Sequence, residues 1–439
     1  MKTILTTIAA GGLLAALSMA QPAPRYSIID LGPLGGTFSQ GFGLNDNRLV
    51  AGASTVRDGT VHAAFWGLGL KMDIGAPGVN SAVYGLNRFA QASVQSETSV
   101  KDPNGENFCA YGTGLQCRPF VWQGGVMTAL PTLGGNNGTV GQVNNRGEVS
   151  GFAENSTRDP ECPSGVTVSG TGPQVLDYEP VIWGPGQGQV RQLHLLPGDT
   201  VGMAFWINDN GQAVGASGRC GNTVLPPVAY GPHAVLWEKD GSVTDLGNLG
   251  GAVVNMALAI NNQGQVVGTS SLSADSMPNL GTHAFLWTKG TGMRDLGTLP
   301  GDAGSVGMGL DESGNVAGAS FDKDGNPRAF FWQNGVMSDL STLIPATSPL
   351  SPIFAEGINS SGEIVGFGAV KSTCTGDPSL CEIHAFLAIP SSGPASRASE
   401  SDAQGGMSES GQFALPENVR RALRQRLPFG RFGAWPTGR

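Results

Sequence analysis

The amino-acid sequence predicts an all-β fold, and within that class a seven-bladed β-propeller with four-stranded blades. Two observations carry the prediction. A unit of four short apolar runs recurs seven times, and one spare run precedes the first copy while the last copy lacks its fourth run. A chain whose first strand completes its last unit closes into a ring, and β-propellers protect their sheet edges in this way.

The repeat unit is clearest from Asp245 to Arg294. Its four runs are too short for helices and suit β-strands; they are Met256–Ile260, Gln265–Ser270, His283–Trp287 and Met293–Leu296. Asn261 and Gly264 bracket the turn between the first two runs. Asn bonds its own backbone there and Gly accepts a positive φ, so we expect a tight hairpin.

Three features of the unit recur along the chain. The predicted repeats are 30–72, 73–128, 129–191, 192–244, 245–294, 295–338 and 339–390, and most open on Asp. The hairpin Asn recurs as Asn45, Asn87, Asn144, Asn208, Asn261 and Asn359, with Asp311 in the sixth copy. The third run starts at His62, Arg118, Glu179, His233, His283, Arg328 and His384, and six of these runs end in Trp. A match at three places in seven copies indicates a true repeat architecture.

The two ends of the repeat region predict how the ring closes. Residues Pro24 to Asp30 occupy the place of a fourth run, and we expect Tyr26 to Asp30 to be the outer strand of the last blade. The first run of each unit is then the innermost strand. Small residues two positions before the hairpin Asn or Asp agree with this, namely Gly43, Gly85, Ala259, Gly309 and Gly357, whereas Gln142 and Trp206 break the pattern. An open β-solenoid and two smaller domains are the alternatives, and the spare strand weighs against both.

These motifs resemble those of the bacterial extracellular HAF-repeat proteins, which take their name from a His-Ala-Phe run. The runs that begin at His283 and His384 match that name, and those that begin at Asp295 and Asn261 match the family's other signatures. The resemblance covers roughly residues 26–390, and the second, third and fourth copies depart from it most. It implies an extracellular repeat protein and supplies no catalytic residues.

Composition and charge narrow the functional classes. The formal net charge is −9, and the repeat body is more acidic still because the tail from Ser391 carries seven Arg against four acidic residues. An acidic body argues against nucleic acid as a partner, because phosphates need a basic face. Residues 1–20 read as a secretory signal with cleavage near Ala20, and no later run is long enough to span a membrane. An uncleaved anchor is the alternative to the signal peptide.

The six cysteines lie in connections between the second and third runs. An even count in a secreted chain predicts disulfides, and proximity favours Cys109–Cys117 and Cys374–Cys381, which leaves Cys162–Cys220. Zinc is the rival interpretation, but no CxxC pair or His cluster supports it. These connections vary most in length, and in a propeller they share one face with the links between blades. We therefore expect ligands on this loop face.

The tail after the repeats has a different composition. Residues 391–406 form a Ser/Gly/Ala-rich linker, and a short basic amphipathic stretch follows, with apolar residues four apart and Arg between them. We expect a mostly disordered tail. Docking of the basic stretch on an anionic surface is the alternative.

The repeated polar residues suggest structural roles more than chemistry. Metal ligation would require His62, His233, His283 and His384 to converge, but one His per blade spreads them around the ring. Hydrogen-bonded structural histidines are the expected outcome. The fragment from Asp322 to Asn326 resembles part of a calcium loop but is short of ligands, so we expect a polar turn. No cofactor or metal is predicted.

Catalytic motifs are absent from the sequence, and only weak candidates remain. Asp199 and Asp302 fall in links between blades and Glu356 on an inner strand, so they would support glycoside chemistry only if they converged near the axis. Trp206 could stack a sugar or fill the axis. The favoured function is a secreted scaffold that binds a protein or polysaccharide. A polysaccharide hydrolase or lyase and a structural envelope or matrix protein are the alternatives.

Overall fold

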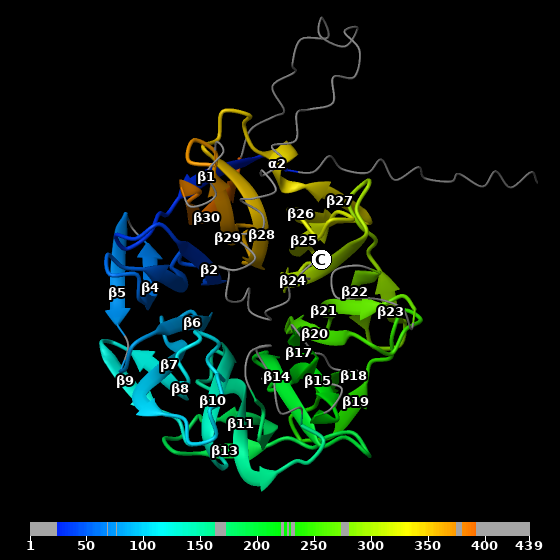
Figure 1. Cartoon of the computed structure of the whole chain (residues 1–439). Coiled ribbons are helices and arrows are strands. Elements are labelled where there is room, and N and C mark those ends of the chain that lie inside the picture. The colour runs from blue at the N-terminus through cyan, green and yellow to red at the C-terminus, as the bar shows by residue number, and fades with distance from the viewer. Residues whose placement is uncertain are drawn as a thin grey trace, which may run out of the picture.

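The computed structural model describes residues 24–391 except 68, 76, 163–172, 221–223, 226–227, 230–232, 274–280 and 375–379. The predicted signal peptide, and the predicted linker and tail beyond residue 391, lie outside the described residues. Seven four-stranded antiparallel sheets surround one axis, so the predicted seven-bladed β-propeller is confirmed (Figure 1). Among the described residues, no helix is both long and apolar enough to cross a membrane.

The blades follow one another along the chain. The first two are β2 (Ser39–Leu44), β3 (Val50–Thr55), β4 (Val61–Gly67) and β5 (Leu70–Gly75), then β6 (Ser81–Leu86), β7 (Ala92–Lys101), β8 (Leu115–Gln123) and β9 (Val126–Ala129). The third is β10 (Gly134–Val143), β11 (Val149–Arg158), β12 (Leu176–Trp183) and β13 (Val190–Gln192). The fourth is β14 (Val201–Ile207), β15 (Ala213–Gly218), β18 (His233–Trp237) and β19 (Val243–Asp245), with a separate ribbon of β16 (Val224–Leu225) and β17 (Val228–Ala229).

The last three blades complete the ring. They are β20 (Asn255–Ile260), β21 (Val266–Ser271), β22 (Thr282–Thr288) and β23 (Gly292–Asp295); β24 (Gly304–Leu310), β25 (Val316–Phe321), β26 (Pro327–Gln333) and β27 (Val336–Asp339); and β28 (Leu350–Ile358), β29 (Ile364–Val370) and β30 (Ile383–Pro390) with β1 (Tyr26–Asp30). A short helix, α2 (Leu340–Leu343), links the sixth and seventh blades.

The N-terminal strand closes the ring as the sequence predicts. Strand β1 pairs antiparallel with β30, from Tyr26 opposite Pro390 to Asp30 opposite Phe386. Tyr26 is 1% exposed, meets the Phe331 ring edge-on at 5.9 Å between centroids, and donates its hydroxyl to the Gly362 carbonyl. The first and last strands therefore share one sheet, and β1 covers the edge that β30 would otherwise expose.

The inner strands converge on the axis, which explains their composition. A Cβ added at Gly309 would lie 2.7 Å from the Cα of Gly357 in the next blade, so a side chain at that position would clash. Each inner strand also carries a register shift just before its hairpin, which accommodates the tight curvature. Buried residues of the inner strands, including Phe205, Leu258 and Met308, pack into one apolar cluster.

Candidate functional site

The residue that opens the third run pairs with the residue that opens the next repeat. Nδ1 of His lies 2.8–3.1 Å from an Asp carboxylate in four blades, and Arg328 contacts Asp339 at 3.2 Å. The four pairs are His62–Asp73, His233–Asp245, His283–Asp295 and His384–Asp30. Each joins two neighbouring strands of one blade, so the structure spreads the histidines around the ring.

The sequence contains a signal of this pairing that the repeat analysis missed. Where Glu179 replaces His, Gln192 replaces Asp, so the two positions of the pair change together. In the His–Asp pairs, the His also shifts the pKa of its Asp partner. Burial alone would raise the pKa of Asp30 and of Asp295, but the hydrogen bond and charge of His384 and His283 lower both.

The hairpin Asn side chains form a ring of hydrogen bonds around the axis. In six blades the Nδ2 atom donates to the backbone carbonyl of the equivalent residue in the next blade, over 2.9–3.4 Å; the donors are Asn45, Asn87, Asn144, Asn208, Asn261 and Asn359. We call this set, with Asp311, the asparagine girdle. Asp311 has no amide hydrogen to donate, so the girdle has one gap in seven.

Each girdle Asn also stabilises its own turn. The Oδ1 atom of Asn261 accepts from the backbone N–H groups of Gln263 and Gln265 at 3.1 and 3.0 Å. Its second Nδ2 hydrogen goes to Oε1 of Gln265 at 2.8 Å, and four other girdle residues bond the side chain four positions on in the same way. These five Asn side chains therefore use their full hydrogen-bonding capacity within the protein.

A second ring lies one residue further along each hairpin, where side chains bridge five of the seven pairs of neighbouring blades. Asp46 accepts from Ser360 at 2.7 Å, Asp209 accepts from Nδ2 of Asn145 at 2.8 Å, and Glu312 accepts from Nδ2 of Asn262 at 2.8 Å. The residue before each girdle position forms a third ring, which is aliphatic in every blade: Leu44, Leu86, Val143, Ile207, Ile260, Leu310 and Ile358.

These three rings surround a hollow of about 170 Å³ at the axis, on the face that carries the hairpins. We call it the axial hollow. Trp206 lines it, half-buried, and packs against the two apolar clusters that contain Leu310 of the sixth blade and Ile260 of the fifth. Trp206 therefore lies at the axis, as the sequence suggested, and its stacking on a sugar stays a prediction.

The three acidic residues considered for catalysis have separate surroundings. Asp199 accepts from Oγ of Ser217 at 2.6 Å in the fourth blade, and Asp302 forms an ion pair with Arg328 at 2.8 Å in the sixth. Glu356 is 1% exposed and lies at the register shift of β28. None of the three lines the axial hollow, so this placement gives no support to joint catalysis there.

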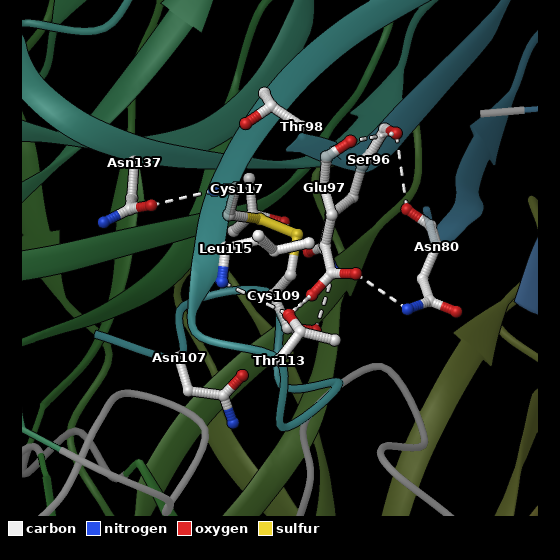
Figure 2. Close-up of a disulfide and its surroundings, with 12 residues drawn as sticks. Asn80, Ser96, Glu97, Thr98, Asn107, Cys109, Thr113, Leu115, Cys117 and Asn137 are labelled. Carbon is white, nitrogen blue, oxygen red and sulfur yellow. Dashed lines mark hydrogen bonds between the residues drawn. A yellow bond between two sulfur atoms is a disulfide. The ribbon is translucent and has the colours of Figure 1, made fainter. Parts of the chain in front are cut away.

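The loop face carries three disulfides. Cys109–Cys117 and Cys374–Cys381 are the pairs that proximity favoured, and Cys162–Cys220 is the pair that remained. The first closes the tip of the long β7–β8 hairpin, beside the fully buried Glu97 (Figure 2). Asn80 donates to the Glu97 carboxylate at 2.7 Å, and Thr113 donates to its other oxygen. Burial raises the pKa of Glu97.

Three more buried acids join the second blade to the third, and sequence reasoning did not single them out. Nδ2 of Asn137 lies 2.9, 3.4 and 3.0 Å from oxygens of Asp102, Glu106 and Glu154. Glu106 also accepts from the backbone N–H of Val175 at 2.7 Å. Burial, and then repulsion from neighbouring carboxylates, raises the pKa of Glu154 well above its usual value and also raises that of Glu106. The cluster fixes the 102–107 loop of blade two against blade three.

A further acidic group lies at the start of β12. Burial, followed by the charge of Asp159, raises the pKa of Asp177 to about 6, and burial with the charge of Asp177 raises that of Glu179 to about 7. Among the described residues, Asp159 with Cys162 and Cys220 is the group of three possible ligands within 4.8 Å of one another. Because the two sulfurs form a disulfide, they provide no thiolate for a metal. The Asp322 fragment forms a hydrogen-bonded turn closed by Asn326.

No family model and no curated protein sequence matches this chain. Similar solved structures include virginiamycin B lyase from Staphylococcus aureus, with 11% identity over 83% of this chain and 100% of that one and a TM-score of 0.48. The acylaminoacyl peptidase of Pyrococcus horikoshii has 11% identity and a TM-score of 0.48, and the alignment covers 83% of this chain and 54% of the peptidase. The propeller domain of the Trilobed protease from Pyrococcus furiosus has 10% identity over 83% and 94% of the two chains, with a TM-score of 0.47. At these identities the similarity concerns the fold alone.

Proposed function

We propose that this protein is a secreted binding scaffold that contacts a protein or polysaccharide through its loop face. The observation that carries the proposal is the bracing of the described parts of the longest loops. Two disulfides and the buried acids Glu97, Glu106 and Glu154 hold the described parts of the connections of blades two to four in place. Loops that are ordered before binding lose less conformational entropy on association, so bracing favours recognition.

We also propose that the protein acts outside the cell. Three disulfides are compatible with an oxidising environment outside the cell. The predicted signal peptide and the resemblance to HAF-repeat proteins point the same way. The separate surroundings of Asp199, Asp302 and Glu356 favour binding over hydrolysis or lysis of a polysaccharide.

A matched pair of valines tests the proposed face. Val100 is 54% exposed near the loop end of β7, and Val336 is 51% exposed on the outer strand β27. The full chain would be screened against arrays of bacterial and plant polysaccharides and of envelope proteins, with product analysis for each ligand. Val100→Asp should weaken binding of the ligand by roughly tenfold or more, since it places a charge in the contact, whereas Val336→Asp should leave it unchanged.

The other outcomes separate the alternatives. Release of shortened products would support the hydrolase or lyase. Binding that is insensitive to Val100→Asp but lost on changing Trp206 would place the contact on the hairpin face and contradict the loop-face proposal. No ligand from either array would favour the structural role in an envelope or matrix.

A further inference from the structure

The axial hollow lies on the face opposite the braced loops, and its chemistry indicates a ligand of its own. Its lining consists of hairpin residues from all seven blades with Trp206 among them. At about 170 Å³ it is smaller than the roughly 300–1,000 Å³ of pockets for drug-sized ligands. It therefore suits one compact group, such as a side chain or a single ring.

The donor hydrogens around the hollow are largely used within the protein. Five of the girdle Asn residues donate both Nδ2 hydrogens, one to the next blade and one within their own turn. In the outer ring, the Nδ2 groups of Asn145 and Asn262 donate to Asp209 and Glu312. A ligand that needs hydrogen-bond donors, such as an anion, finds few in this lining.

The lining still offers hydrogen-bond acceptors, and they belong to negatively charged carboxylates. A carboxylate offers about four lone-pair sites, and those of Asp46 and Asp209 accept two hydrogen bonds each from neighbouring hairpins. Glu312 is the third acid in the lining. One cation, Arg88, lines the hollow with them, and its guanidinium lies over the exposed Phe89 ring at 4.6 Å. The lining therefore carries three negative charges and one positive charge.

Trp206 supplies the complementary surface. An indole face attracts a cation through its quadrupole and also covers the apolar body that carries the charge. The aliphatic ring that includes Leu310 and Ile358 extends this apolar surface. An aromatic and aliphatic surface beneath a rim of carboxylates is suited to a small body that bears a positive, donor-rich group.

We propose that the axial hollow binds a protonated amine carried on a compact apolar group. The rim carboxylates Asp46, Asp209 and Glu312, which belong to three different blades, attract the ammonium, and the body that carries it rests on Trp206. The site is independent of the loop-face function, because the two lie on opposite faces of the ring.

Three probes of the same shape test the charge preference. Benzylamine, benzyl alcohol and benzoate would be titrated into the full chain by calorimetry and by ligand-observed NMR at neutral pH and low salt. Benzylamine should bind most tightly and benzoate least, and salt should weaken the amine selectively because it screens the carboxylates. Equal binding of benzylamine and benzyl alcohol, or no binding of benzylamine at millimolar concentration, would overturn the proposal.

Substitutions of lining residues then test where the ligand binds. Glu312→Gln keeps an Oε1 acceptor for Asn262 and removes one charge, so it should weaken benzylamine by roughly fivefold and leave benzyl alcohol unchanged. Trp206→Leu should weaken both. Asp58→Asn is the control, since Asp58 is an exposed loop-face acid whose Oδ1 accepts from Thr60. Equal effects of Glu312→Gln and Asp58→Asn would mean that the amine senses only the net charge of the protein, against the proposal.

Discussion

The gap in the asparagine girdle gives a prediction about stability. Asp311 lies where six other blades have Asn, is 6% exposed, and has no amide hydrogen for the Asn359 carbonyl. Asn208 is its counterpart with the bond in place, since it donates to the Asn261 carbonyl at 2.9 Å. Asn208→Asp should therefore create a second gap, and Asp311→Asn should close the existing one.

The magnitudes follow from the bonds that change. Asn208→Asp keeps the two backbone donors to Oδ1 at 3.0 Å but loses the bonds to the Asn261 carbonyl and to Oε1 of Gln212 at 2.8 Å. Leaving a buried acceptor without its partner costs about 1–3 kcal/mol, and the new charge faces oxygen atoms. We expect a loss of roughly 2–4 kcal/mol. Asp311→Asn should gain about 1 kcal/mol, the net value of one added hydrogen bond, provided that Asn315, whose Nδ2 now donates to Asp311 at 2.7 Å, turns its Oδ1 toward the new amide.

Denaturant unfolding is the appropriate assay, because 1 kcal/mol shifts the melting temperature of so long a chain by only about 1 °C. Asn248→Asp is the control, since Asn248 is exposed and its Oδ1 accepts from the N–H of Gly250, a role that Asp retains. If Asn208→Asp unfolds at the same denaturant concentration as the control, or if Asp311→Asn is destabilising, the girdle does not stabilise the ring as argued.

Three further predictions concern closure, cross-links and pH. Tyr26→Ala should lower the free energy of unfolding by about 3–5 kcal/mol, because it empties the buried contact between β1 and the sixth blade; calorimetry against the exposed Ser27→Ala would measure it. Replacing both cysteines of Cys162–Cys220, 58 residues apart, should cost about 4 kcal/mol. The same change at Cys109–Cys117, 8 apart, should cost about 2–3 kcal/mol, and equal costs would contradict the loop-entropy reasoning. The pKa of Glu179 is about 7 in the folded protein, above its ordinary value of 4.5, so folding favours the protonated side chain. The stability that Glu179 contributes is therefore complete below its ordinary pKa and is lost as the pH rises through 7. Glu179→Gln should thus stabilise the protein at pH 8 by up to about 3 kcal/mol and have little effect at pH 4, as judged by unfolding at the two pH values.

The fold could be predicted from the sequence because each element carries its own local signal. The apolar run 256–260 and the Asn-to-Gly turn after it specify a strand and a hairpin without reference to the rest of the chain. Ring closure was the one long-range inference, and it rested on counting runs. The pairing of Tyr26 with Pro390 then follows, because an unpaired strand at each end would expose two edges.

The candidate site was less predictable because it depends on contacts between blades. Asn261 looks like a turn residue in the sequence, but its bond to the Asp311 carbonyl appears only when the blades lie side by side. The hollow on the hairpin face was missed for the same reason, since loop length drew attention to the other face. Glu106 and Glu154 are 48 residues apart and meet around Asn137 only in the folded ring.

Seven repeats in one chain also help to separate structural residues from functional ones. A feature present in most blades, such as the girdle Asn or the His–Asp pair, is explained by the geometry that all blades share. Trp206 is different, because five blades have Gly or Ala at that position to fit beside the axis and the fourth has the largest side chain. The ring needs no aromatic residue there to close. Packing against its apolar neighbours is one physical reason for a Trp at this position and a specific surface at the axial hollow is another, and the binding experiments on Trp206 separate the two.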